Sequence, residues 1–144
     1  MANSPIEVTA GSLELLTLAT KARDKAYAPY SKFPVGVALR TRAGTIHSGC
    51  NIENTSFPEG WCAETSAISA MIMAGESVES TEIEELVVVA DHTPPITPCG
   101  GCRQRIKEFG TPGTVIHAAD LEGIQQSFTL AALLPAAFDL EGEA

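Results

Sequence analysis

Three cysteines and one glutamate stand at spacings that suit a metal site. Cys99 and Cys102 are three residues apart, so at the start of a helix both sulfurs lie on one face and can reach the same ion. Thirty-six residues separate Cys62 from Cys99, so this third ligand must come from another element. Glu64 follows Cys62 by two residues, where a carboxylate could take a proton from a water held at the metal.

The number of candidate ligands indicates the kind of site. A structural zinc has four protein ligands, whereas a catalytic zinc typically has three and an open position for water. Cys50 as a fourth ligand would leave Glu64 without a purpose, so we expect it to be a small buried thiol. The histidines His47, His92 and His117 have no metal spacing, and we expect surface or core side chains. The sequence therefore favours a catalytic zinc held by three thiolates.

This constellation resembles the zinc-dependent cytidine deaminases, in which ligand-x-Glu is followed by Pro-Cys-x-x-Cys. The likeness is to the small type with three cysteine ligands. It spans nearly the whole chain, in residues 29–36, 49–54, 62–64, 98–104 and 133–138. The resemblance implies hydrolytic deamination of cytidine or deoxycytidine in pyrimidine salvage. It also implies one Zn²⁺ per subunit bound by Cys62, Cys99 and Cys102, with Glu64 as the catalytic residue that moves protons.

The resemblance also implies which residues bind the nucleoside. It places Phe33 against the pyrimidine, and it makes Asn51 and Glu53 the pair that hydrogen-bonds the ribose hydroxyls. The backbone near Ala63 would read the edge of the ring. A carboxylate at Glu53 would also disfavour a nearby phosphate, so a nucleoside is expected.

Two further phenylalanines are assigned to the pocket through the subunit arrangement of this family, a homotetramer. Phe57 stands where the family often has a tyrosine that is used across a subunit contact. Phe138, near the end of the chain, would reach a neighbouring subunit's pocket. We therefore expect a homotetramer whose sites are shared between subunits.

Thr65 departs from the commonest pattern, which has arginine directly after Cys-Ala-Glu. Three thiolates around Zn²⁺ leave a net charge of −1, and threonine offers one neutral hydrogen bond. We expect helix amino termini and backbone donors to compensate. Arg103 and Gln104 follow Cys102 and could brace the ligands, although ordinary packing explains them equally well.

Length, charge and hydropathy narrow the classes of protein. The 144 residues suit a single domain over 1–144. The net charge of −9 argues against a nucleic-acid partner. No apolar run reaches the length of a membrane span, and the start Met-Ala-Asn-Ser-Pro has no basic region followed by an apolar one. We expect a cytoplasmic protein without a membrane partner, whose thiols stay reduced and available for metal.

Periodicity predicts an α/β fold. Helices are expected over 12–27, 62–74 and 99–109 and strands over 33–40, 45–51, 85–90 and 114–118, followed by a helical turn over 127–134. In the first strand, Val35, Val37 and Leu39 should face one side and Gly36 and Ala38 the other. The resemblance implies a three-layer α/β/α arrangement with a mixed five-stranded sheet. Both metal segments then lie where a strand turns into a helix.

Three other functions remain open. A deaminase of another aminopyrimidine nucleoside, such as blasticidin S, would share the metal site, but the ribose pair argues against it. A non-catalytic zinc-binding module would need four thiolate ligands. A thiol–disulfide oxidoreductase using Cys99 and Cys102 would leave Cys62 and Glu64 unexplained.

Overall fold

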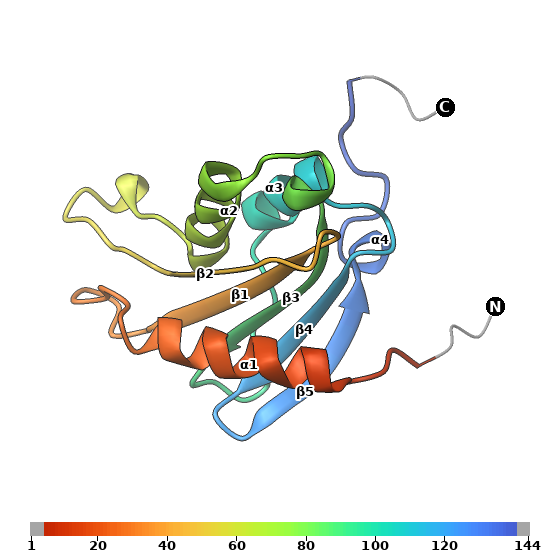
Figure 1. The fold of residues 1–144 in the computed structure, drawn as a ribbon. Coiled ribbons are helices and arrows are strands. Elements are labelled where there is room, and N and C mark those ends of the chain that lie inside the picture. The colour runs from red at the N-terminus through yellow and green to blue at the C-terminus, as the bar shows by residue number, and fades with distance from the viewer. Residues whose placement is uncertain (1–4, 141–144) are drawn as a thin grey trace.

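The structure, a computed structural model, describes residues 5–140 and has one sheet between two layers of helices (Figure 1). Residues 1–4, on which the expectation that the chain lacks a leader partly rests, lie outside that range. The helices are α1 (Ala10–Arg23), α2 (Ala63–Ala74), α3 (Gly100–Phe109) and the short α4 (Leu130–Leu133), with 3₁₀ turns η1 (Phe57–Glu59) and η2 (Glu79–Thr81). The strands are β1 (Val35–Thr41), β2 (Ile46–Cys50), β3 (Ile83–Ala90), β4 (Val115–Asp120) and β5 (Gly123–Thr129). None of the helices within 5–140 combines the length and the apolar character that a membrane span needs.

The sheet is mixed, as predicted. Its strand order is β2-β1-β3-β4-β5. β3 and β4 are parallel and are connected through α3, whereas the other neighbouring pairs are antiparallel. β1 and β2, which correspond to the first two expected strands, form a hairpin whose turn includes Gly44 with a φ of 88°, a value that favours glycine.

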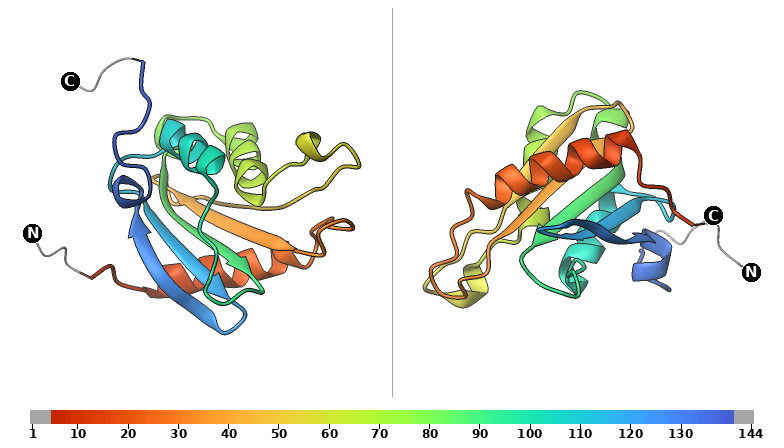
Figure 2. Two further views of the ribbon diagram at one scale, coloured as in Figure 1. Left: turned by 180° about the vertical axis from the view of Figure 1, so that it is seen from behind. Right: turned by 90° about the horizontal axis from the view of Figure 1, so that it is seen from below.

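Each face of the sheet has its own apolar core. α2 and α3 cover one face, and α1 covers the other (Figure 2). The core under α2 and α3 includes Val35, Val37 and Leu39 from β1, whereas Ala38 belongs to the core under α1. The predicted alternation of β1 is therefore confirmed. β3 contributes to both cores, which explains its long apolar run.

Two glycines let the helices approach the sheet closely. A Cβ atom at Gly36 would lie 2.0 Å from the carbonyl oxygen of Ala19, in α1. A Cβ atom at Gly49 would lie 2.4 Å from the backbone nitrogen of Ala67, in α2. Both separations are too short for a side chain, so glycine at these positions fixes how tightly the layers pack.

The strand register brings the starts of α2 and α3 to the same edge of the sheet. Ala90, at the end of β3, pairs with Val35, and Cys50, at the end of β2, pairs with the adjacent Gly36. The loops that leave these two strand ends lead to α2 and α3. The two helices therefore begin near each other although their sequences are far apart.

The prediction for the carboxyl-terminal part was wrong in one respect. Residues 127–129 belong to strand β5, which pairs with β4, and helix α4 is limited to Leu130–Leu133. The expected turn over 127–134 therefore begins three residues too early. The first helix also ends earlier than predicted, at Arg23, because Tyr27 forms a bridge with Ile52 instead.

A buried polar network occupies the α1 face of the sheet. The Glu85 carboxylate accepts hydrogen bonds from Ser12 of α1 and from Arg40 of β1. It also lies 2.6 Å from Nε2 of His117, whose Nδ1 is 2.7 Å from the hydroxyl of Ser127. The network thus joins α1 to four strands. His117 is a core histidine, one of the two alternatives expected, with both ring nitrogens partnered.

The network sets the ionisation of Glu85. Burial disfavours its charge, but the hydrogen bonds with His117 and Ser12 and the charge of Arg40 outweigh burial and lower its pKa from 4.5 to about 2. A carboxyl with a lowered folded-state pKa stabilises the fold above pH 4.5. This stabilisation, about 3 kcal/mol from the size of the shift, is lost as the pH falls through 4.5 toward 2.

We predict that Glu85→Gln lowers the free energy of unfolding at pH 7 by about 3 kcal/mol, because a partner of a buried charged network is removed. Urea unfolding of both proteins at a series of pH values should show this difference shrinking below pH 4.5. Glu84→Gln, on the exposed side of the same strand, is the control and should behave as wild type. A deficit that does not change with pH would contradict the assignment.

Candidate metal centre

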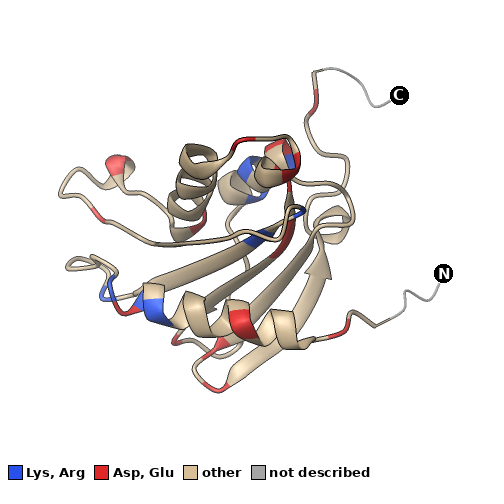
Figure 3. Cartoon of the chain, viewed as in Figure 1, with Lys and Arg blue, Asp and Glu red and all other residues tan. Residues whose placement is uncertain are grey.

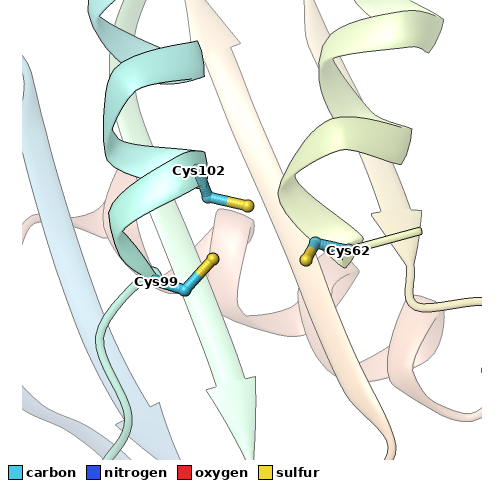
Figure 4. Close-up of side chains that lie close together, drawn as sticks. All are labelled: Cys62, Cys99 and Cys102. Atoms are coloured by element: carbon cyan, nitrogen blue, oxygen red, sulfur yellow. The ribbon is translucent and has the colours of Figure 1, made fainter. Parts of the chain in front are cut away.

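The three cysteines named from their spacing come together between α2 and α3. Cys62 is the residue that caps the amino end of α2, and Cys99 caps that of α3. Cys102 lies one turn further along α3 and is fully buried. Their side chains point toward one another from the two helix starts (Figure 4).

The size of the cluster fits zinc. All three sulfur atoms lie within 4.8 Å of one another. Sulfurs about 2.3 Å from a tetrahedral zinc would be separated by about 3.8 Å, so the cluster could bind the ion with small adjustments. Within residues 5–140, neither Cys50 nor the Glu64 carboxylate belongs to this group of ligand atoms. Three protein ligands, one fewer than a structural zinc needs, are typical of a catalytic zinc site, which keeps its fourth position open.

The pKa values of the clustered thiols depend on one another. A hydrogen bond from Cys102 lowers the pKa of the Cys62 thiol. The same hydrogen bond, together with burial, raises the pKa of Cys102, and the charge of Glu64 raises both values. A bound cation would favour the deprotonated sulfurs and let all three carry negative charge together. The amino ends of α2 and α3 add partial positive charge beside the sulfurs.

Glu64 is buried next to the cluster. It lies in the first turn of α2 and has 5% of its surface exposed. Burial raises the pKa of its carboxyl, although a hydrogen bond with Cys102 and the charge of Arg105 act in the opposite direction. A buried carboxylate beside a metal ligand has the placement of a group that exchanges protons with whatever occupies the site.

Arg103 holds the loop that precedes the ligands. Its guanidinium donates to the Pro98 carbonyl at 2.7 Å, to the Thr97 hydroxyl at 2.8 Å and to the Leu133 carbonyl at 2.8 Å. Arg103 therefore holds the backbone just before Cys99, whereas its bracing of the ligands themselves stays a prediction. Gln104 instead donates to the Phe138 carbonyl, which attaches the carboxyl-terminal segment to α3.

The predicted ribose pair divides into two kinds of residue. Glu53 lines a cavity of about 260 Å³ with Tyr30, Ser31 and Phe57. Its Oε1 accepts hydrogen bonds from the backbone nitrogens of Tyr30 and Ser31. The side chain of Asn51 is engaged elsewhere: its Oδ1 accepts from the Val35 nitrogen. Its Nδ2 donates to the Phe33 carbonyl, so Asn51 ties the loop before β1 to the end of β2.

The backbone links this cavity to the metal cluster. Ile52 and Trp61 exchange two backbone hydrogen bonds of 2.9 and 2.8 Å, and Glu53 donates its N–H to the Tyr27 carbonyl. Cys62 directly follows Trp61. The loop that carries Glu53 is thereby fixed against the residue that begins the α2 side of the cluster.

The aromatic residues expected at the substrate differ in their placement. Phe33 is partly buried and its ring meets that of His92 edge-on at 6.2 Å. Phe57 is 72% exposed and lies 5.6 Å from the ring of Tyr30. Phe138 is 67% exposed and lines a separate cavity against α3. Ala63, 1% exposed, begins α2. One chain thus places Phe57, but not Phe138, beside Glu53.

Arg105 was missed by the sequence analysis. Its Nη1 donates to the sulfur of Cys102 at 3.6 Å, while the Thr65 hydroxyl lies 3.9 Å from the same sulfur. The spacing of three residues between Cys102 and Arg105 was the available signal, because such pairs are neighbours on a helix. Tyr30, within the 29–36 segment that carries the resemblance, was given no role of its own, and the structure places it in the cavity wall.

This chain is similar to known proteins along most of its length. A family model described as the cytidine and deoxycytidylate deaminase zinc-binding region matches residues 11–118. The cytidine deaminase of Sporosarcina psychrophila is 44% identical over 128 residues, which cover 89% of this chain and 91% of that protein. That of Halalkalibacterium halodurans is 39% identical over 127 residues, covering 88% and 93%.

Solved structures agree with the sequence relatives. The crystal structure of cytidine deaminase from Burkholderia pseudomallei superposes with a TM-score of 0.79 at 39% identity, covering 88% of this chain and 98% of that one. That from Mycobacterium tuberculosis gives a TM-score of 0.74 at 34% identity, covering 89% and 97%. The fold expected from the resemblance is confirmed.

We predict that replacing any one of the three clustered cysteines by serine greatly reduces bound zinc, because two thiolates do not complete the site. Zinc per chain, measured by mass spectrometry of the purified protein, should be close to one in the wild type. Cys50→Ser is the matched control and should keep its zinc, since Cys50 lies outside the cluster. Loss of zinc in the Cys50 variant would instead point to a four-cysteine structural site.

Proposed function

The chain belongs to the cytidine and deoxycytidylate deaminase family, and on this premise we propose the substrate and the role of each site residue. The reaction is zinc-dependent hydrolytic deamination of cytidine, and we propose that deoxycytidine is deaminated as well. The observation that carries this conclusion is a cluster of three sulfurs with one buried carboxylate beside it. A zinc-binding family and a donor set of this size together make zinc the cofactor.

We assign the ligands as Cys62, Cys99 and Cys102. When bound, zinc lowers the pKa of a coordinated water toward neutrality and so supplies a nucleophile. Glu64 would accept one proton of the attacking water and pass it to ring N3, and would then accept the second, from the new C4 hydroxyl, and pass it to the leaving amine. Its carboxyl is held beside Cys102 and shielded from solvent, as this role requires. One carboxyl thus serves as base and then as acid.

Substrate recognition is assigned to the edge of the sheet next to the cluster. Glu53 would bind the ribose hydroxyls from the cavity that it shares with Phe57, and Phe33 and the backbone of Ala63 would contact the pyrimidine. Asn51 supports this site because its side chain holds the loop of Phe33. These two contacts leave one acceptor position on Oδ1 and one N–H on Nδ2, which could hydrogen-bond the ribose.

A nucleoside is favoured over a nucleotide. A hydrogen bond from Ser31 lowers the pKa of Glu53, so this carboxylate stays charged at neutral pH. A substrate phosphate beside it would be repelled. The surface argues in the same direction against nucleic acid: the net charge is −9, and Lys and Arg form small groups with Asp and Glu between them (Figure 3).

We further propose that the single domain over 1–144 works in the cytoplasm, in pyrimidine salvage, as a homotetramer. Exposed rings support the assembly: Phe57, Trp61 and Phe138 each have more than half of their surface open in the single chain. In the proposed assembly, neighbouring subunits would cover these rings and so remove their apolar surface from water. In the tetramer, Phe138 would complete a neighbour's pocket.

We predict that Glu64→Gln lowers kcat by about 10²–10⁴-fold, because the amide cannot carry the protons. Ultraviolet absorbance follows the loss of cytidine, and zinc content is measured on the same samples. The variant should keep its zinc, since Glu64 lies outside the ligand cluster. Turnover near the wild-type rate in the zinc-loaded variant would disprove the assignment.

We predict that Glu53→Gln raises KM for cytidine about tenfold or more, because a charged hydrogen bond is lost. Comparing cytidine with 2′,3′-dideoxycytidine tests the contact itself. Wild type should prefer cytidine, and the variant should lose much of this preference. Glu59→Gln, an exposed acid in the same loop, should leave both values unchanged. A preference that survives in the Glu53 variant would assign the hydroxyls to another residue.

A further inference from the structure

The filled metal site has a charge that the ligands do not balance. Three thiolates and one Zn²⁺ carry a net charge of −1, and the carboxylate of Glu64 lies beside them. Cys102 and Glu64 are almost completely buried, so water screens part of this charge poorly. Arg105 is an exposed residue, so a positive charge there would act on the cluster through its direct contact with the buried Cys102 sulfur.

Thr65 does not supply that charge. It lies next to Glu64 on α2, and its hydroxyl approaches the Cys102 sulfur at 3.9 Å. A hydroxyl offers one neutral hydrogen bond. Arg103, the arginine that directly follows Cys102, is also committed elsewhere, because its guanidinium nitrogens donate to Thr97, Pro98 and Leu133.

Arg105 has the position that remains. Its Nη1 donates to the Cys102 sulfur at 3.6 Å, from one helical turn further along α3. The guanidinium folds back along the first turn of the helix, where a Cβ atom at Gly101 would lie 3.3 Å from the same Nη1. Glycine at 101 therefore leaves room for the arginine to reach the cluster.

We propose that Arg105 is a positioning residue for the metal centre, which offsets the negative charge of the zinc and its thiolates through Cys102. Three observations carry the proposal: the contact with the ligand sulfur, the space left by Gly101 and the engagement of Arg103 elsewhere. It rests on the proposed zinc site and deepens it. We expected helix amino termini and backbone donors to offset this charge, and Arg105 adds a full positive charge to them.

The test is zinc retention, measured by competition with a chelating dye at constant pH. Arg105→Gln should weaken zinc binding about 10- to 100-fold, the usual effect of removing a group that supports a metal ligand. Arg105→Lys should keep most of the affinity, because it keeps the charge. Arg42→Gln, at the exposed hairpin between β1 and β2, is the matched control and should bind zinc as wild type does.

A second variant separates charge from local structure. Thr65→Arg, added to Arg105→Gln, brings a guanidinium toward the same sulfur from α2 and should recover affinity. The cobalt-substituted proteins give an independent signal, because the thiolate-to-cobalt absorption band should shift in Arg105→Gln and return in the double variant. Thermal unfolding with excess chelator should be equal in all variants, which shows that folding is unaffected.

The outcomes are distinct from those of the deaminase assay. Unchanged zinc affinity and an unchanged cobalt spectrum in Arg105→Gln would overturn the proposal even if the wild type deaminates cytidine. Reduced affinity that neither Arg105→Lys nor the added Thr65→Arg restores would also overturn it, since charge would not be the cause. A wild type that binds zinc without deaminating cytidine would refute the proposed function and leave this inference standing.

Discussion

Three sulfur atoms from the starts of two helices lie within 4.8 Å of one another, and a metal site built from them depends on how the sheet places those helix starts. The pairing of Val35 with Ala90 and of Gly36 with Cys50 puts the ends of β2 and β3 at one edge of the sheet. α2 and α3 both start from that edge and cover the same face (Figure 1). The amino ends of two helices, which favour negative charge, therefore meet where the thiolates gather.

The two faces of the sheet differ in how they treat charged groups. The face under α2 and α3 is apolar and buries Glu64 at its edge, so the carboxyl proposed to react is shielded from water. The face under α1 holds a charged network around Glu85, whose carboxylate has one partner from each of α1, β1 and β4. His117 and Ser127 extend this network to β5, the strand at the far edge. A fully bonded network of this kind holds α1 and the outer strands in one register.

Much of this could be predicted from the sequence where the signal is local. The Cys-x-x-Cys spacing, the alternation of β1 and the apolar run of β3 each depend on neighbours along the chain. β5 lacked such a signal, because an edge strand with Gln125 and Gln126 on its exposed part shows no clear alternation. The engagement of Asn51 and the reach of Arg105 depend on side-chain directions that only the packed helices and strands define.

The metal site can be formed within one chain, whereas the proposed substrate site would need neighbouring subunits to close it. The three clustered cysteines and Glu64 all come from one chain and are positioned by its own helices, so the proposed zinc site needs no ligand from a neighbouring subunit. The ring of Phe57 is 72% exposed, and Phe138 lines a separate cavity against α3, so one chain leaves the proposed substrate cavity open to solvent. In the proposed tetramer, neighbouring subunits would cover this opening. Assembly would then affect affinity for the nucleoside more than affinity for zinc, because contacts that exclude water strengthen the polar interactions made by Glu53.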